Sequence, residues 1–411
     1  MSEHGTSEQR MSEHRMSERS GPALPDAGGS MGEHLVEVED LTVRVAGREG
    51  PPILDAVSFT VAPGKMTALV GESGAGKSMT TKAVLGLLDD RIFEVSGRVV
   101  VAGRDVSAMR ARARRRYTSS VTSLVFQNPT KALNPTMRVG PQIAEALRFS
   151  AAGQHLSAKE AHARAVELMK QVGIAAPQER FHAYPHQMSG GMKQRAVIAI
   201  ALSMNPKVLF CDEPTSSLDV TTQALIMDLL DELRERLGIG ILFITHDLVL
   251  AASRADDVLV LHSGRVVERM PVRDIFESAA MPYTRDLIAR VPGIIETPPG
   301  ARAPAEAEPD LVALDALAPD ALAPDPLVPV ALVPVTQSAA GPEAAPGASA
   351  CRYVGQCAIH QEICTERVPP LALIEPGHLV RCWFPVGHQP LDLAAGPDAA
   401  AAVATTPQKG A

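Results

Sequence analysis

The chain has 411 residues, 45% of them hydrophobic and only 3% aromatic, with a formal net charge of -8 at pH 7. This length predicts two to three domains at about 150 residues each, and the lack of a basic excess argues against a general nucleic-acid-binding protein. The longest uncharged apolar run, residues 326–342, is interrupted by Pro329 and Pro334 and does not predict a membrane helix. The N-terminus lacks the apolar core of a secretory signal, so we expect a cytoplasmic chain that is able to dock on a membrane protein.

Residues 1–31 are polar and self-similar, because Met-Ser-Glu-His begins at both Met1 and Met11. Too few apolar groups are present to offset the entropy lost on ordering, so we expect a disordered tail. Met31 is an alternative start to Met1.

Residues 32–295 show the pattern of an α/β domain. Short apolar runs and alternating runs predict strands, and longer segments with helical periodicity predict helices. Strands that alternate with helices indicate a sheet covered on both faces. The predicted strands are Leu35–Val38, Leu41–Val45, Thr67–Val70, Val208–Cys211, Ile241–Thr245 and Asp257–Leu261, and the predicted helices are Ala158–Val172 and Val220–Leu237.

A phosphate-binding loop is predicted between the strand at Thr67–Val70 and a following helix. The segment Gly71-Glu72-Ser73-Gly74-Ala75-Gly76-Lys77-Ser78 has the spacing G-x-x-x-x-G-K-[ST]. Its glycines let backbone N–H groups point at phosphate oxygens, and the helix start adds positive potential. Lys77 is expected to reach the β- and γ-phosphates, and the Ser78 hydroxyl to bind Mg²⁺. A chance glycine-rich turn is the alternative, and the strand before and helix after argue against it.

Two adjacent carboxylates, Asp212 and Glu213, follow the apolar strand Val208–Cys211. Charge at the end of a buried strand needs a reason. Successive strand residues point to opposite sides, so the two carboxylates can serve separate roles. We expect Asp212 to hold Mg²⁺ through water and Glu213 to act as the general base. The alternative is a strand that simply ends in a polar turn.

Three further motifs are weak signals when each is taken alone, but their order and spacing after the phosphate-binding loop strengthen them. Ser189-Gly190-Gly191, between Met188 and Met192, precedes a helical run at Lys193–Ser203. Asp219 follows the carboxylates, and His246 ends the strand after them.

Together, these motifs resemble those of the nucleotide-binding subunits of ABC transporters, over residues from about 35 to 291. The resemblance implies a P-loop NTPase cassette with a RecA-like core, an antiparallel β subdomain and a helical signature subdomain. It implies ATP as substrate and Mg²⁺ held through Ser78, Gln127 and Asp212. It further implies that Gln127 senses a membrane partner and that His246 contacts the γ-phosphate. Asp219 matches the D-loop, and Ser189, Gly190 and Gly191 match the signature that grips ATP held by an opposite subunit.

Two departures from the family pattern stand out. Met188 and Met192 replace the usual Leu and Gln that flank the signature core. The segment Leu41–Val45 has no aromatic residue to stack on adenine, so we expect Val45 to pack on the base.

The phrases around Phe126–Met137 and Ser216–Gln223 resemble the peptide and nickel importer branch, and Met188–Arg195 resembles its D-type subunit. This resemblance implies a second ATPase subunit of F type, two permease subunits and an extracytoplasmic solute-binding protein. It places the chain on the cytoplasmic face of the cell (inner) membrane as a peripheral subunit. It implies no nucleic-acid partner. A soluble ABC ATPase in DNA repair or translation and an inactive regulatory cassette are the rival interpretations. The five arginines in Arg110–Arg116 predict a solvated helix face or one near anionic lipid headgroups, with a nucleic-acid contact as the alternative.

The C-terminal part divides into a Pro/Ala/Asp-rich linker at 296–350, a cysteine-containing extension at 351–393 and a disordered tail at 394–411. The extension carries Cys351, Cys357, Cys364 and Cys382, which suit a structural metal or cluster. The resemblance implies a [4Fe–4S] cluster, as some members of that branch carry, and Zn²⁺ in a four-cysteine site is the physical rival. Four unligated thiols remain a third possibility, and Cys211 is expected to pack in the core.

Overall fold

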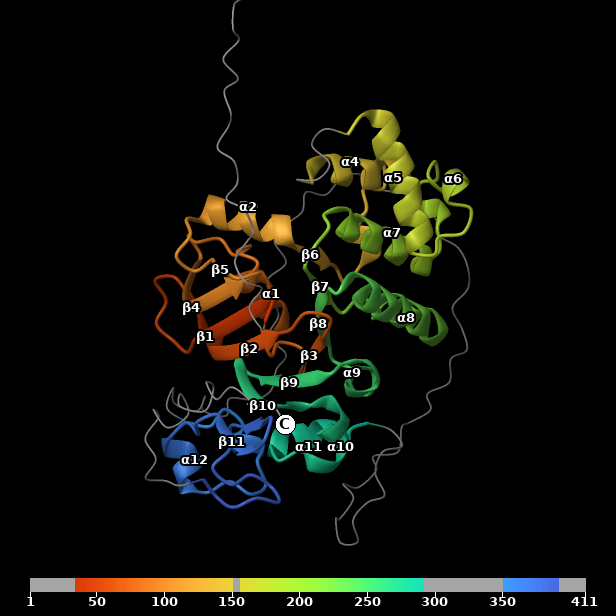
Figure 1. Ribbon diagram of the computed structural model, residues 1–411. Helices are drawn as coiled ribbons and strands as arrows, with labels where there is room; N and C mark the ends of the chain where they lie inside the picture. The colour runs from red at the N-terminus through yellow and green to blue at the C-terminus, as the bar shows by residue number, and fades with distance from the viewer. Residues whose placement is uncertain (1–33, 151–155, 292–349, 392–411) are drawn as a thin grey trace, which may run out of the picture.

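The computed structural model describes residues 34–150, 156–291 and 350–391. The predicted tails at 1–31 and 394–411 and nearly all of the linker at 296–350 lie outside these ranges. The described elements form two sheets and a group of helices (Figure 1).

The smaller sheet is antiparallel, with strand order β2-β1-β4-β5. Its strands are β1 (Val36–Val45), β2 (Leu54–Val61), β4 (Phe93–Val101) and β5 (Arg104–Asp105). The two strands predicted at the N-terminal end of the domain are therefore one strand. Its pairing shifts register between Val38 and Leu41, where Asp40 has a positive φ of 50°.

The larger sheet has eight strands in the order β11-β12-β10-β9-β3-β8-β7-β6. Its centre, from β9 to β6, is parallel, and β10, β11 and β12 pair antiparallel at one side. The strands are β3 (Met66–Val70), β6 (Thr122–Val125), β7 (Val208–Asp212), β8 (Gly240–Thr245), β9 (Asp257–His262), β10 (Arg265–Pro271), β11 (Ala372–Glu375) and β12 (His378–Val380).

Side chains on the two faces of the large sheet belong to two separate hydrophobic cores. On β3, Met66, Ala68 and Val70 join a core with the helical layer, whereas Leu69 joins a core with β1, β2 and α1. Such alternation follows from the two-residue period of a strand. Both faces are covered, which explains the nearly uninterrupted apolar runs in the sequence.

The helices begin and end at recognisable signals. Ser157 and Glu160 form a capping box at the start of α5, and Asp219 caps α8, which ends at Gly238 with a φ of 63°. The predicted helix at Val220–Leu237 matches α8, and that at Ala158–Val172 is one residue longer than α5. The helices are α1 (Lys77–Val84), α2 (Ala111–Val121), α3 (Pro129–Ala132), α4 (Val139–Phe149), α5 (Ala158–Gln171), α6 (Pro177–Arg180), α7 (Gly190–Ser203), α8 (Val220–Leu237), α9 (Leu248–Arg254), α10 (Ile275–Ser278), α11 (Pro282–Ala289) and α12 (Glu362–Glu366).

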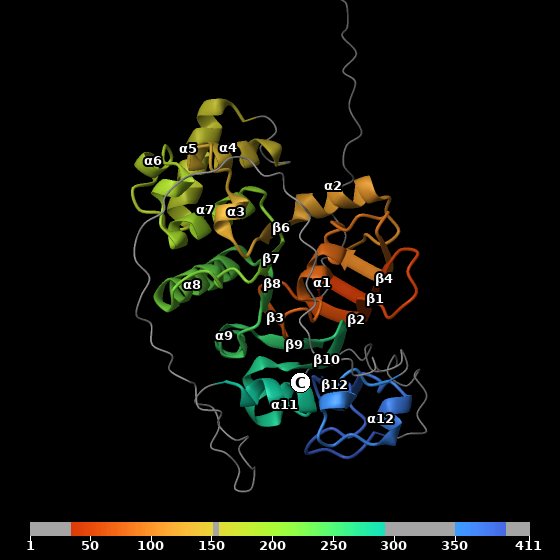
Figure 2. The same ribbon diagram turned by 180° about the vertical axis from the view of Figure 1, so that it is seen from behind.

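The described part of the cysteine-containing extension continues the large sheet. Strand β12 pairs with β10 through Glu268 with Val380 and Arg269 with Leu379. The extension thus lies beside α11 and the edge of the cassette (Figure 2). Among the described helices, none has both the length and the apolar character needed to cross a membrane.

Candidate functional site

The phosphate-binding loop lies between β3 and α1, as the sequence predicted. Gly71 tolerates no side chain, because an added Cβ would lie 2.2 Å from the carbonyl oxygen of Leu261. Gly76 has a φ of 108°, and a Cβ there would lie 2.7 Å from Leu54. These two glycines therefore let the loop pass closely over neighbouring strands and turn into the helix.

Lys77 is buried and points back into the loop. Its Nζ donates to the carbonyl oxygens of Gly71 at 2.8 Å and Glu72 at 3.0 Å. Burial lowers the pKa of Lys77, although the nearby carboxylates of Glu213, Asp212 and Glu72 oppose this shift. A desolvated ammonium inside a glycine-rich loop is well suited to bind an anion such as a triphosphate.

The predicted Mg²⁺ ligands Ser78 and Asp212 lie together. The Ser78 hydroxyl donates to Oδ1 of Asp212 at 3.2 Å. Burial raises the pKa of Asp212, and the Ser78 hydrogen bond opposes that shift. A half-buried carboxylate beside a hydroxyl at the phosphate loop fits a hard cation such as Mg²⁺. Gln127, the third predicted ligand, donates instead to Glu213 in this structure.

Glu213 is held by side chains from two neighbouring strand ends. Nε2 of Gln127 donates to its Oε2 at 2.8 Å, and Nδ1 of His246 lies 3.2 Å from its Oε1. The three residues follow β6, β7 and β8, which are adjacent and parallel. Carboxyl ends of parallel strands meet at one edge of a sheet, where α/β proteins bind ligands. The structure therefore brings together the predicted base, glutamine and histidine.

The signature residues lie elsewhere in the cassette, against the D-loop. Ser189 caps α7, so Gly190 and Gly191 are its first helical residues, earlier than the predicted helical run began. An added Cβ on Gly191 would lie 2.5 Å from Thr222, which follows Asp219 in α8. Figure 1 shows α7 and α1 in different parts of the molecule. The structure does not bring the signature to the phosphate loop of the same chain.

Two contacts of the phosphate loop carried no signal in the sequence. The backbone N–H of Glu72 donates to the hydroxyl of Tyr283 at 3.1 Å, and Arg290 forms an ion pair with the Glu72 carboxylate. More than 200 residues separate these partners, and no motif spacing relates them. Val45, the expected adenine contact, is half-buried and pairs with Phe93 of β4, which supplies an aromatic ring beside it.

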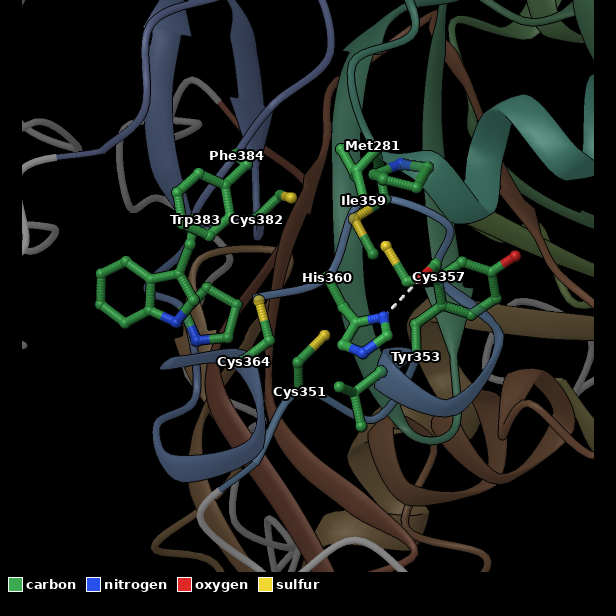
Figure 3. A pocket seen from close by; sticks show the side chains of 13 residues that line it. Met281, Cys351, Tyr353, Cys357, Ile359, His360, Cys364, Cys382, Trp383 and Phe384 are labelled. Carbon is green, nitrogen blue, oxygen red and sulfur yellow. Dashed lines mark hydrogen bonds between the residues drawn. The ribbon is translucent and has the colours of Figure 1, made fainter. Parts of the chain in front are cut away.

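The four cysteines of the extension line one apolar cavity (Figure 3). The backbone N–H of Cys351 donates to the carbonyl of Cys364 at 2.8 Å, which closes the segment around the cavity. Burial raises the pKa of the Cys351 and Cys382 thiols to about 12. No three His, Cys, Asp or Glu side chains in the described ranges are arranged to hold a metal ion as they stand. Cys211 is fully buried in β7, as expected of a core residue.

The arginine run forms the start of α2. Arg110, Arg112, Arg115 and Arg116 are exposed, as a solvated helix face requires.

A buried lysine in a glycine-rich loop, a carboxylate pair and a histidine at parallel strand ends define a P-loop ATPase. Comparisons with known proteins narrow this class. The family model described as ABC transporter matches residues 54–216. A probable peptide ABC transporter ATP-binding protein of Sinorhizobium fredii is 36% identical over 351 residues, which cover 85% of this chain and 94% of that protein. The oligopeptide transport ATP-binding protein OppD of Mycobacterium bovis is 45% identical over 260 residues, covering 63% of this chain but only 42% of that longer relative.

The fold agrees with these relatives. A solved dimeric ATP-binding cassette, in a post-hydrolysis state bound to ADP and Pi, aligns with a TM-score of 0.51 at 27% identity. The alignment covers 58% of this chain and 99% of that one. The chain belongs to the ATP-binding subunits of ABC transporters, and it binds and hydrolyses ATP.

Proposed function

We propose that this chain is the energy-coupling subunit of a peptide importer and works as one half of a pair of cassettes. The main support is the match to a probable peptide transport subunit along 94% of that relative's length. The oligopeptide transport protein OppD agrees with this cargo over the cassette region. Nickel-like solutes are the second cargo class that the sequence motifs favoured.

The side chains at the strand ends have distinct roles in hydrolysis. Lys77 exchanges its contacts with the Gly71 and Glu72 carbonyls for phosphate oxygens. Ser78 and Asp212 would hold Mg²⁺, which neutralises charge on the phosphates. Glu213 accepts the proton of the attacking water, and Gln127 and His246 hold its carboxylate in place.

The signature supplies the reason for a pair. Ser189, Gly190 and Gly191 form the start of α7, where backbone N–H groups attract anions. Since this helix start lies apart from the phosphate loop of its own chain, its phosphate comes from a second cassette, of F type by resemblance. Two permeases and an extracytoplasmic solute-binding protein complete the complex. The chain then acts as a peripheral subunit on the cytoplasmic face of the inner membrane, and no nucleic acid takes part.

Uptake measurements test this proposal. A host strain lacking this chain is complemented with the wild type, with Glu213→Gln or with the control Glu232→Gln, whose side chain is 63% exposed on α8. We expect the wild type and the control to restore uptake of labelled di- or oligopeptides, and Glu213→Gln to fail. Restored nickel uptake alone would move the cargo to the second class. Restoration of neither, with the chain stably produced, would contradict import.

We further propose that Cys351, Cys357, Cys364 and Cys382 hold a [4Fe–4S] cluster, with Zn²⁺ as the rival. The support is that four thiols line one apolar cavity and that either group takes four thiolate ligands, although binding would require the side chains to move from their present arrangement. Metal and sulfide analysis of the full-length chain, purified without oxygen, distinguishes them. About four iron atoms and as much sulfide per chain support the cluster, and about one zinc supports the rival. Cys382→Ser should lower the metal content while the core control Cys211→Ala retains it. A folded chain without metal would leave four free thiols.

A further inference from the structure

Helix α11 holds the start of the phosphate-binding loop. The ring of Tyr283 is almost fully buried, at 2% exposure, and its hydroxyl accepts the N–H of Glu72 at 3.1 Å. Arg290, directly after α11, forms an ion pair with the carboxylate of Glu72. Glu72 is thus held by one side chain of α11 and by one from the residue directly after it.

Glu72 is also a contact of the phosphate-binding lysine. Its carbonyl oxygen accepts from Nζ of Lys77 at 3.0 Å. Glu72 therefore has both contacts: its N–H is held by Tyr283, and its carbonyl oxygen binds Lys77. A displacement of Glu72 changes the position from which Lys77 reaches a phosphate.

The start of α11 also touches the cysteine cavity. Met281 and Pro282, at the start of the helix, line the cavity together with the four cysteines. Tyr353, two residues after Cys351, donates its hydroxyl to Asp286 of α11 and is 3% exposed. The rings of Tyr353 and Tyr283 are 5.4 Å apart between centroids at an interplanar angle of 67°, an edge-on packing (Figure 3 shows Tyr353 beside the cavity).

A second contact runs from the same segment to the other end of the loop. Arg352 donates to the carbonyl of Ser263 and forms an ion pair with Asp55 at 2.9 Å. Gly264, the residue after Ser263, donates its N–H to the carbonyl of Ala75 in the phosphate loop at 2.8 Å. The extension therefore supports the phosphate loop near both of its ends.

We infer that Tyr283 and Tyr353 are positioning residues for nucleotide binding. Tyr283 holds the start of the phosphate loop, and the C-terminal extension holds Tyr283 through the ring of Tyr353 and its bond to Asp286. A loop already held in its binding geometry loses less freedom when nucleotide arrives. This inference rests on the ATP site and is independent of the cargo and of whether the cavity holds a metal.

Equilibrium titration with Mg-ATP tests the inference on full-length chain carrying Glu213→Gln, so that nucleotide is not consumed. Tyr283→Phe removes the acceptor for the Glu72 N–H, and we expect the Kd for Mg-ATP to rise about three- to tenfold. Tyr353→Phe should also raise the Kd for Mg-ATP, but by a smaller factor. In the double variant the Kd should rise by less than the product of the two single rises, because both residues act through one chain of contacts.

Tyr117→Phe is the matched control. Its hydroxyl donates to the carbonyl of Val101 in the antiparallel sheet, and we expect an unchanged Kd. In chains with Glu213 intact, Tyr283→Phe should raise the KM for ATP and leave kcat within about twofold.

Two results would overturn the inference. One is a Tyr283→Phe variant with a lower Tm but a Kd within twofold of its parent, because that pattern reports packing alone. The other is a double variant whose effects multiply in full, which would separate Tyr353 from Tyr283. A parent chain that binds no Mg-ATP would refute the nucleotide site itself. That result differs from the first one, in which the parent binds Mg-ATP and Tyr283→Phe leaves the Kd unchanged.

Discussion

Glu213 combines an unusual backbone with a constrained side chain. Its φ of 45° is uncommon for a residue with a Cβ, and its N–H donates to the carbonyl of Ile244 at 2.9 Å. Gln127 and His246 bind one carboxylate oxygen each. Such a conformation persists only where the surroundings fix it, and it is often found at active sites. Here it turns Glu213 away from the line of β7 toward the neighbouring strand ends.

Glu213→Gln tests the role of this carboxylate. The amide retains the size of the side chain but cannot accept the proton of water, so ATP turnover should fall about 10²- to 10⁴-fold. Nucleotide binding should persist, since Lys77 and the loop are intact. Phosphate release and Mg-ATP titration measure the two effects separately. Turnover equal to that of the wild type would remove Glu213 from the role of base.

Gly71→Ala tests how tightly the phosphate loop passes over the sheet. The new methyl group would lie 2.2 Å from the Leu261 carbonyl oxygen, whereas one on Gly74 meets no atom within 4 Å. Both glycines have positive φ, so their difference isolates the collision. We expect Gly71→Ala to lower the free energy of unfolding by about 1–3 kcal/mol more than Gly74→Ala. Urea denaturation of both variants checks this, and equal losses would contradict the collision.

At the scale of elements, the order of the parallel strands assembles the site. The loop follows β3, and Gln127, Glu213 and His246 follow β6, β7 and β8, so all project from one sheet edge. The sequence predicted the strand for each motif except Gln127, because apolar runs and end charges are local signals. Periodicity did not predict which strands are neighbours, because pairing joins segments far apart in the chain.

The extension shows where sequence patterns stop being informative. Strands β11 and β12 have four and three residues, too short for a clear alternation. The partner of β12 is β10, and Glu268 and Val380 pair across more than 100 residues of chain. Tyr283 was likewise unmarked, because a hydroxyl contact to a distant backbone N–H leaves no spacing in the sequence. The four cysteines that the sequence grouped by spacing do line one cavity, whereas the metal or cluster expected there stays a prediction.

Asp256 joins three elements just before β9. One carboxylate oxygen accepts from Lys65 at 2.8 Å, and the other accepts from the N–H of Met66 at 2.9 Å and from Arg234 of α8 at 2.7 Å. Although burial opposes the shift, the hydrogen bonds from Lys65 and Met66 hold the pKa of Asp256 below its ordinary value of 3.8. The ionised form therefore stabilises the fold above that ordinary value, and this contribution is lost as pH falls through the lower folded pKa.

Asp256→Asn should lower the free energy of unfolding at pH 7 by about 1 kcal/mol, a modest value because the carboxylate is partly exposed. The difference from the wild type should shrink below pH 3.8, where Asp256 of the wild type takes up a proton. Denaturation curves at several pH values measure it. Asp274→Asn is the control, since Asp274 pairs with the exposed Arg273 next to it. A difference that is constant with pH would contradict the role of charge.

At the scale of the whole molecule, the extension covers the edge of the cassette's sheet. Without β12, the edge of β10 would present unpaired backbone groups to other chains. A buried pair lies at this joint: Nε2 of His378 is 2.8 Å from Oε1 of Glu268, and both side chains are almost fully buried. The same oxygen of Glu268 accepts from the N–H groups of Ala280 and Met281, which lead into α11. The joint therefore connects the extension to the helix that holds the phosphate loop.

His378→Phe should weaken this joint more than any exposed histidine change. Phenylalanine fills the space of the imidazole but cannot bond to Glu268, so a buried carboxyl loses one partner, at a cost of about 2–4 kcal/mol in unfolding free energy. Because the loss falls on the contact between β12 and β10, the extension should detach before the cassette unfolds. Limited proteolysis should then release residues after 291 faster than in the wild type or in His388→Phe, which changes the ring neighbour of His378 and keeps its bond to Glu268. Equal cleavage rates in all three chains would show that strand pairing and the apolar contacts, not this pair, hold the extension in place.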